Sequence, residues 1–217
     1  MARVNYDLQL KELKNQMLLL GSMIEEVIRK TIHALITQDV QEAKQIASGD
    51  EKIDAQVRKI EQLGYTILLR QQPIANDLRA VSAAMKMITD MERIGDHGAD
   101  ISELTVLMSK ESYPNEIELV KQMSKETSMM LIQAVDAFAD GNMQKASAVI
   151  ARDDIVDDVF LQVKNSLANS IKENDTDVMQ ELDLLMVAKY FERIGDHATN
   201  IAEWVIFSIN GELPADD

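Results

Sequence analysis

Hydrophobic residues recur every three or four positions along most of the chain, which is the spacing that lines one face of an α-helix. In the first such stretch, Leu10, Leu13, Met17, Leu20 and Ile24 follow this spacing. Short polar or proline-containing segments separate one stretch from the next. The pattern therefore predicts an all-α protein with six helices, at about residues 5–36, 40–69, 74–110, 116–139, 143–172 and from beyond 176 to about 209.

The segment Tyr113-Pro114-Asn115 divides the predicted helices into two sets of three. Proline lacks a backbone donor and disfavours helix at the residue before it, while asparagine is a common helix cap. Short connections between consecutive helices favour antiparallel neighbours. We therefore expect two tandem three-helix bundles, one over residues 1–112 and one over residues 113–217, the second ending in a short tail.

An internal repeat supports this division. The six residues Glu-Arg-Ile-Gly-Asp-His at positions 92–97 recur unchanged at positions 192–197, which is 100 positions later. The agreement continues beyond the hexapeptide at Ile101 and Ile201. A fixed period of this kind indicates a duplicated structural unit. The two bundles are therefore expected to resemble each other.

Acidic residues interrupt the hydrophobic face of the predicted helices at matching places in the two repeats. At about 100° per residue, positions i, i+4, i+8 and i+11 share one side of a helix. In the third and sixth helices these positions hold Glu92, Asp96, Asp100 and Glu103, and Glu192, Asp196, Asn200 and Glu203. The second and fifth helices carry Asp50 and Asp54, and Asp153 and Asp157. Acids thus occupy positions where core residues are expected.

Helices joined by a short turn are antiparallel, so residues at equal distances from the turn lie level with each other. Asp54 lies 18 residues before Gln72, and Glu92 lies 20 residues after it. The corresponding acids of the second repeat match to a similar degree about Asp175. Each repeat is therefore expected to bring four carboxylates together, and their repulsion has to be relieved by protonation, basic partners or bound cations.

Two interpretations of these acids remain open. Oxygen ligands suit hard cations such as Fe(III), Mn, Mg or Ca, the number of acids could hold more than one ion per site, and zinc fits less well without His or Cys. Alternatively, the acids belong to two interhelical salt-bridge clusters, in which basic residues neutralise them, namely Arg58, Arg93, Arg152 or Arg193. The duplication favours cations. A single acidic pair on a helix is weak evidence for a metal site, whereas four pairs at matched levels in two repeats are much stronger evidence.

The repeated hexapeptide also contains a histidine and a glycine. His97 and His197 point about 140° away from the glutamates of their hexapeptides, which favours a structural or interface role over metal ligation. A glycine costs about 1 kcal/mol in a helix interior. Gly95 and Gly195 therefore indicate either a closely packed neighbouring helix or room beside the acids.

Composition and charge exclude several classes of function. The formal net charge is −15, from 22 basic and 37 acidic residues, and it disfavours binding to nucleic acid. The chain has no cysteine, so disulfides and thiolate metal sites are excluded. It shows no signal peptide and no apolar run of membrane-spanning length. We therefore expect a cytoplasmic protein.

Three features together resemble the PhoU family of phosphate-uptake regulators, and the resemblance covers nearly the whole chain. They are the segment Arg-Gln-Gln-Pro-Ile-Ala-Asn-Asp-Leu-Arg at positions 70–79, the two hexapeptides and the paired acids. The resemblance implies a cytoplasmic accessory protein that restrains the high-affinity phosphate transporter and the phosphate-starvation two-component response when phosphate is plentiful. The implied partners are the transporter's ATPase subunit and a phosphate-sensing histidine kinase. It further implies a homodimer that reaches the membrane only through these partners.

The resemblance also implies multinuclear metal clusters, of iron or of zinc, and the oxygen ligands leave manganese or magnesium as further possibilities. The implied ligands are Asp50, Asp54, Glu92, Asp96, Asp100, Asp153, Asp157, Glu192, Asp196 and Asn200. Asn200 lacks the charge of Asp100, so the second site is expected to bind fewer ions or to bind them more weakly. The Gln-Gln-Pro segment has no counterpart near Asp175, which breaks the symmetry there.

Two other functions compete with a regulator that acts by contact. One is a metal enzyme, either a ferritin-like oxidase or a phosphohydrolase, which would need an open coordination position. The other is a purely structural helical scaffold. The sequence offers no acid, base or nucleophile apart from the proposed ligands, so we expect a protein that is not an enzyme.

Overall fold

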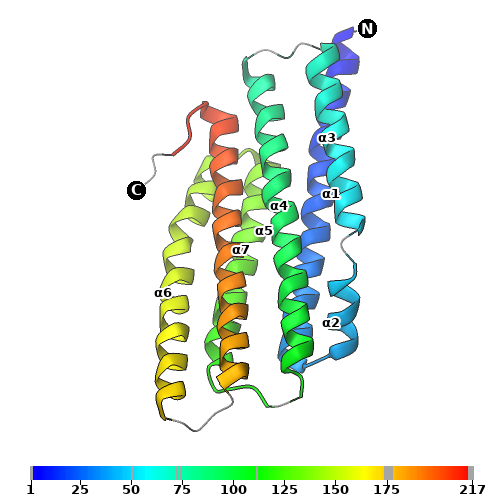
Figure 1. Cartoon of the computed structure of the whole chain (residues 1–217). Coiled ribbons are helices and arrows are strands. Elements are labelled where there is room, and N and C mark those ends of the chain that lie inside the picture. The colour runs from blue at the N-terminus through cyan, green and yellow to red at the C-terminus, as the bar shows by residue number, and fades with distance from the viewer. Residues whose placement is uncertain are drawn as a thin grey trace.

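Seven α-helices make up almost all of the described chain (Figure 1). The computed structural model describes residues 2–49, 51–71, 73, 75–110, 112–173 and 178–214. The helices are α1 (Ala2–Thr37), α2 (Val40–Ala47), α3 (Glu51–Gln71), α4 (Ala75–Met108), α5 (Ile117–Asp140), α6 (Met143–Glu173) and α7 (Val178–Asn210). No strand occurs within these ranges, so the predicted all-α class is confirmed. None of the described helices is long and apolar enough to cross a lipid bilayer.

The sequence pattern predicted one helix over residues 40–69, and this prediction is wrong, because the segment forms two helices. Asp39 caps α2 by accepting hydrogen bonds from the backbone N–H groups of Gln41 and Glu42, at 2.9 and 3.0 Å. At the other end, the Gly49 N–H donates to the Ile46 carbonyl at 3.0 Å, which closes a turn in place of another helical bond. Glycine is a poor helix former, and α3 begins at Glu51.

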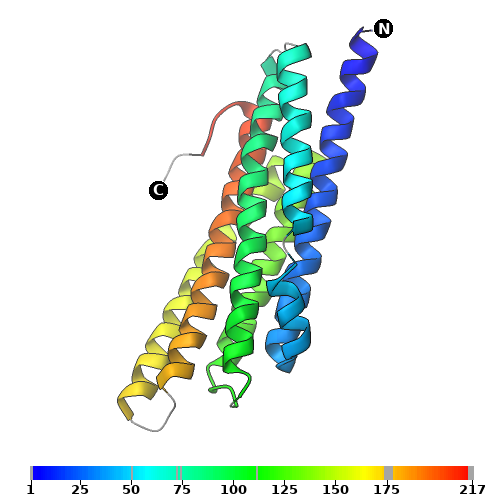
Figure 2. The same cartoon turned by 45° about the vertical axis from the view of Figure 1, so that its right-hand side comes forward.

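The helices form two adjoining groups that correspond to the two repeats. The first group contains α1 to α4 and the second contains α5 to α7, and α4 and α7 share the most extensive helix–helix contact. Figures 1 and 2 show α4 and α7 side by side along the length of the molecule. The helix α1 also packs against α5.

Both repeats contribute to one continuous buried apolar core. Ile24 and Ile28 of α1, Ile94 of α4, and Phe191 and Ile194 of α7 are at most 1% exposed and belong to the same cluster. These residues follow the helical spacing of the sequence, so each long helix turns one apolar face inward. The shared core holds the acidic helices α3, α4, α6 and α7 in fixed register.

Candidate functional site

Four acids of the second repeat gather where α6 meets α7, and we call them the C-terminal acidic cluster. They are Asp153 and Asp157 of α6 and Glu192 and Asp196 of α7. Burial raises the pKa of Asp153 to about 6, and the negative charges of Asp196, Asp157 and Glu192 contribute to this rise. Burial and Glu192 also raise the pKa of Asp157 and of Asp196. The predicted level pairing of the two helices is therefore confirmed.

Two oxygen atoms of this cluster are buried without a hydrogen-bond partner, namely Asp153 Oδ1 and Glu192 Oε2. A buried carboxylate oxygen without a partner is costly, so it marks a place where a proton or a cation is stabilising. Gly195 leaves space for the Asp153 carboxylate, because a Cβ atom at position 195 would lie 3.1 Å from Asp153 Oδ1. This position explains the glycine in the second hexapeptide.

The basic residues that were considered as neutralising partners bind elsewhere in this repeat. Arg152 forms an ion pair with Glu126 of α5, and the Arg193 guanidinium lies 5.9 Å from the centre of the Tyr190 ring. Lys189 does form an ion pair with Glu192. Among the described residues, Lys189 is the one basic residue that pairs with any of these four acids, so the salt-bridge interpretation accounts for only a part of this cluster.

The corresponding acids of the first repeat, Asp54, Glu92 and Asp96, form what we call the N-terminal acidic cluster. Burial raises the pKa of Glu92, and the charges of Asp54 and Asp96 add to the effect. Asp50, the fourth predicted member, lies outside the described residues. Arg58 pairs with Asp54 at 3.6 Å and Arg93 with Asp96 at 3.2 Å, so salt bridges neutralise more of this cluster.

The two repeats differ at the glycine of the hexapeptide. A Cβ atom at Gly95 would lie 3.1 Å from Ile53 Cδ1, whereas its counterpart at Gly195 would meet Asp153 Oδ1. The break between α2 and α3 is the physical reason, because α3 starts at Glu51 and places Ile53 of its first turn over Gly95. An apolar side chain thus occupies the place that an acid takes in the second repeat.

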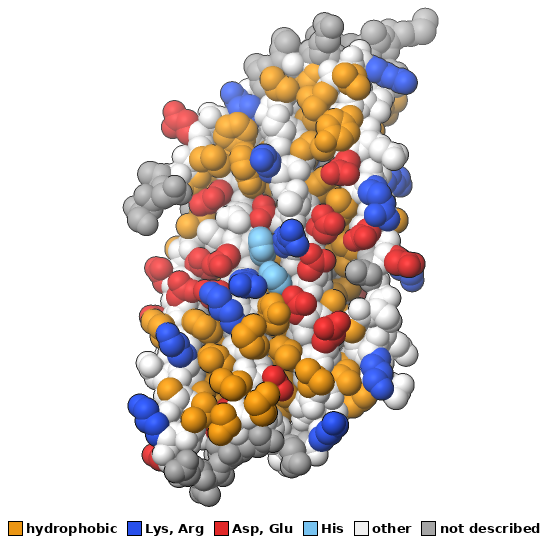
Figure 3. Space-filling model, viewed as in Figure 1, with side chains coloured by type: hydrophobic (Ala, Val, Ile, Leu, Met, Phe, Trp, Pro, Cys, Tyr) orange, Lys and Arg blue, Asp and Glu red, His pale blue; other side chains and the backbone are white. Residues whose placement is uncertain are grey.

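The two histidines of the hexapeptides lie at the interface of α4 and α7, with ring centroids 5.6 Å apart. Figure 3 shows two histidine side chains next to each other in the middle of one face, with acidic side chains on both sides. His197 Nδ1 lies 2.9 Å from Asp90 Oδ1, and His97 Nδ1 lies 3.2 Å from Asp100 Oδ2. Burial lowers the pKa of His97. The predicted interface role of both histidines is confirmed.

Two residues that were predicted as metal ligands also lie at this interface. Asn200 donates a hydrogen bond from Nδ2 to Asp90 Oδ1 at 3.1 Å, and Asp100 is the partner of His97. The structure therefore places Asp100 and Asn200 in contacts at the boundary of the repeats, one turn beyond the acidic clusters. Their predicted role as ligands stays a prediction.

The geometry of the acids bears on whether they fit a metal ion. Among the described residues, no three Asp, Glu or His side chains stand close enough together to hold one. The donor set of the C-terminal acidic cluster nevertheless fits a hard cation, because it consists of carboxylates, two of which carry a buried oxygen without a partner. Asp157 and Asp196 are exposed, so an ion at this cluster would be reached from the solvent.

Sequence reasoning missed Asp90, Lys189 and Tyr190. Asp90 joins the two repeats through His197 and Asn200, and Tyr190 lies 5.4 Å from the His97 ring, centroid to centroid. Positions 90 and 97 are seven residues apart and share a helix face, which is a usable signal. The contact partner of that face, however, depends on how the repeats pack.

The raised pKa of Asp153 predicts how stability depends on pH in metal-free protein. Its pKa is about 6 in the folded chain against 3.8 ordinarily, so its favourable contribution is complete below 3.8 and is lost as the pH rises through 6. Asp153→Asn removes the charge. We expect it to raise the melting temperature of chelator-treated protein at pH 7.5 by about 2–4 °C, with a smaller gain at pH 4.

The exposed neighbour Asp158 supplies the matched control for this prediction. Asp158→Asn makes the same change of charge on the same helix and should leave the melting temperature within about 1 °C of the unmodified protein. Differential scanning calorimetry at both pH values makes the comparison. An equal gain from both variants would show that the effect comes from net charge and not from the buried position of Asp153.

Comparison with known proteins agrees with the repeat and with the fold. A family model described as the PhoU domain matches the chain twice, over residues 17–105 and 120–205. The chain belongs to the PhoU family. One match falls in each repeat, so the duplication that the hexapeptides indicated extends through both helical groups.

Several PhoU relatives match over nearly their whole length. A protein of Clostridium acetobutylicum named phosphate-specific transport system accessory protein PhoU homolog is 35% identical, covering 98% of this chain and 97% of the relative. A protein of Methanothermobacter thermautotrophicus named phosphate-specific transport system accessory protein PhoU homolog 1 is 31% identical, with coverage of 98% and 97%. The family likeness is therefore not confined to the hexapeptides.

Crystal structures of PhoU proteins share this architecture. PhoU from Pseudomonas aeruginosa superposes with a TM-score of 0.92 at 29% identity, covering 95% of this chain and all of that chain. The phosphate transport system regulatory protein PhoU from Streptococcus pneumoniae gives a TM-score of 0.89 at 28% identity, with coverage of 97% and 99%. The predicted PhoU-like arrangement of two repeats is confirmed.

Proposed function

We propose that this chain is a cytoplasmic accessory protein of a high-affinity phosphate transporter, which restrains uptake and the phosphate-starvation response when phosphate is plentiful. The observation that carries the proposal is the match, at 35% identity over 98% of the chain, to a relative named as a phosphate-specific transport system accessory protein. The partners we propose are the transporter's ATPase subunit and the phosphate-sensing histidine kinase. The homodimer implied by the family resemblance stays a prediction.

The proposed mode of action is contact with partners and not turnover of a substrate. The relatives are named accessory proteins. The histidines of the hexapeptides, which are the residues most suited to acid–base work, are held by Asp90 and Asp100 at the interface of the repeats. This arrangement suits them to join two helices.

We further propose that the acidic clusters bind metal ions that stabilise the partner-binding shape of each repeat. Iron is the proposed ion, with zinc, manganese or magnesium as alternatives, and the carboxylates would supply oxygen ligands. The C-terminal acidic cluster is the stronger candidate, because Asp153 has a buried oxygen without a partner and the N-terminal acidic cluster has two arginine ion pairs. The missing charge at Asn200 suggested the opposite, namely that the site of the second repeat is the weaker one.

Deletion of the gene tests the regulatory proposal. In phosphate-rich medium, cells without the protein are expected to keep phosphate-starvation genes transcribed and to take up phosphate faster than the parent strain, because the restraint is missing. Transcript levels and uptake of labelled phosphate measure the two effects. Reintroducing the unmodified gene should restore repression. Repression that persists in the deletion strain would contradict the proposal.

A further inference from the structure

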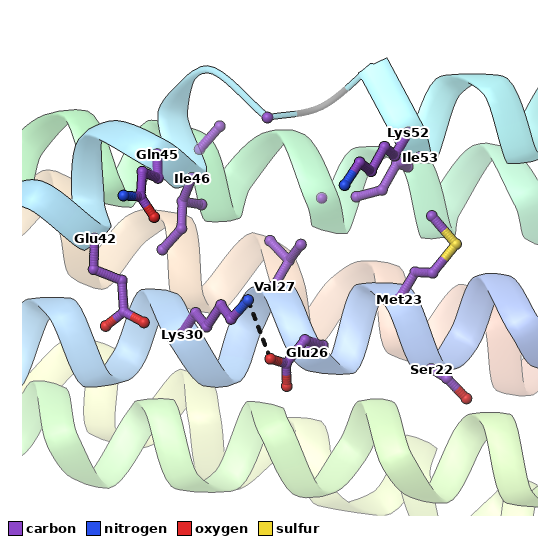
Figure 4. A pocket seen from close by; sticks show the side chains of 13 residues that line it. Ser22, Met23, Glu26, Val27, Lys30, Glu42, Gln45, Ile46, Lys52 and Ile53 are labelled. Atoms are coloured by element: carbon purple, nitrogen blue, oxygen red, sulfur yellow. Dashed lines mark ion pairs between the residues drawn. The ribbon is translucent and has the colours of Figure 1, made fainter.

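A pocket of about 620 Å³ lies in the first repeat, between α1, α2 and the facing parts of α3 and α4 (Figure 4). Its apolar lining comes from Met23 and Val27 of α1, Ile46 of α2 and Ile53 of α3. Figure 4 shows these side chains turned toward the space between the helices. The volume lies in the range of small-molecule sites, which is about 300–1,000 Å³.

The break between α2 and α3 shapes this pocket. Gly49, at the break, and Gly95 and Ala99 of α4 all line it, so little side-chain volume projects into the pocket from these positions. The helix α6, which is the counterpart in the second repeat, continues without a break from Met143 to Glu173. The pocket is thus tied to a feature that distinguishes the first repeat from the second.

The carboxylates at the pocket are already engaged by basic groups. Glu26 accepts two hydrogen bonds from Arg29, at 2.7 and 2.8 Å, and also pairs with Lys30 at 3.2 Å. Glu42 lies 2.6 Å from His33 Nδ1. Neither acid therefore presents a fully free charge to a ligand.

The two lysines at the pocket, Lys30 and Lys52, have N–H donors that can bind a ligand. Lys52 lies in the first turn of α3, and within the part of the chain that the structure describes its ammonium group has no hydrogen bond or ion pair. Lys30 shares the carboxylate of Glu26 with Arg29, which holds that carboxylate through two bonds. Figure 4 shows the Lys52 amino group extending toward the space between the labelled side chains, and the Lys30 amino group directed at Glu26. An anion placed between the two amino groups would gain charge-assisted hydrogen bonds.

We propose that this pocket binds a small amphipathic anion. Its apolar body lies against Met23, Val27, Ile46 and Ile53, and its anionic group binds Lys52 and Lys30. This ligand class follows from the combination of apolar walls with the unpaired ammonium group of Lys52 and the shared one of Lys30, since specific sites pair an apolar lining with a few placed polar groups. Such a site goes beyond the proposed regulatory function and does not depend on the metal sites.

Titration of the full chain with 8-anilinonaphthalene-1-sulfonate tests the proposal, because this probe joins a sulfonate to an apolar aromatic body and fluoresces when shielded from water. We expect one tight site per chain. Lys52→Glu should weaken binding at least about tenfold by replacing attraction with repulsion. Lys44→Glu, on the exposed side of α2 and outside the lining, is the matched control and should bind like the unmodified protein.

A second variant tests the pocket itself. Ala99→Leu extends a side chain into the space and should abolish the tight site while the melting temperature stays unchanged. Decanoate should displace the probe, and decyltrimethylammonium, a cation of equal chain length, should not. The proposal is overturned if the probe finds no tight site, if Lys52→Glu and Lys44→Glu bind alike, if Ala99→Leu binds undiminished, or if the cation competes as well as decanoate.

Discussion

A chain that carries Asp153→Asn and Glu192→Gln is expected to lose the tighter of the two proposed metal sites, with an affinity at least about 100-fold lower there. Both substitutions keep the size of the side chain and remove the charge, and both residues have a buried oxygen without a hydrogen-bond partner. Loss of residues that only support a metal ligand already costs about 10–100-fold, so loss of two ligands costs more. Elemental analysis of protein purified without chelators, together with calorimetric titration with Mn²⁺, measures the effect.

The control for this prediction is Asp158→Asn combined with Glu212→Gln, which changes the same two charges at exposed positions outside the cluster. It should leave both stoichiometry and affinity unchanged. If the cluster variant also kept the stoichiometry and affinity of the unmodified protein, then the C-terminal acidic cluster is not a metal site.

Bound metal is expected to raise the melting temperature by about 5–10 °C, and a chelator should reverse the rise. An ion at 100 times its dissociation constant stabilises the native state by about 2.7 kcal/mol, and each kcal/mol corresponds to about 2–4 °C for a chain of this size. The physical reason is that the cation compensates the burial and the mutual repulsion that together raise the pKa values of Asp153 and Asp196. Thermal unfolding followed by circular dichroism, with and without Mn²⁺, measures the shift.

Variants of the two clusters separate their contributions to this shift. Asp153→Asn with Glu192→Gln should remove most of it, whereas Glu92→Gln with Asp96→Asn should remove less, because Arg93 already pairs with Asp96. A melting temperature that responds neither to the metal nor to the chelator would favour the salt-bridge interpretation of both clusters.

The sequence predicted the long helices and the meeting of the acids because both depend on short-range periodicity. Helical spacing places Glu192 and Asp196 on one face, and distance from the turn sets them level with Asp157 and Asp153. These rules need no knowledge of how the repeats pack. The outline of each acidic cluster therefore follows from residue spacing alone.

The break between α2 and α3 and the role of Asp90 depend on other kinds of information. A single glycine is tolerated inside many helices, so Gly49 by itself does not predict a break. A signal was nevertheless present, since the acids Asp54 and Asp157 lie 103 residues apart whereas the hexapeptides lie 100 apart. The pairing of Asp90 with His197 arises only from the packing of α4 against α7, which periodicity does not encode.

The most direct test of the central claim, that this chain regulates phosphate transport by contact, is affinity purification from the cells that encode it. The tagged protein is cross-linked in phosphate-rich medium and the captured proteins are identified by mass spectrometry. We expect the ATPase subunit of the phosphate transporter to be enriched over a mock purification, and the enrichment to fall in phosphate-starved cells. Absence of every transporter component and of the sensor kinase, in cells shown to contain them, would contradict it.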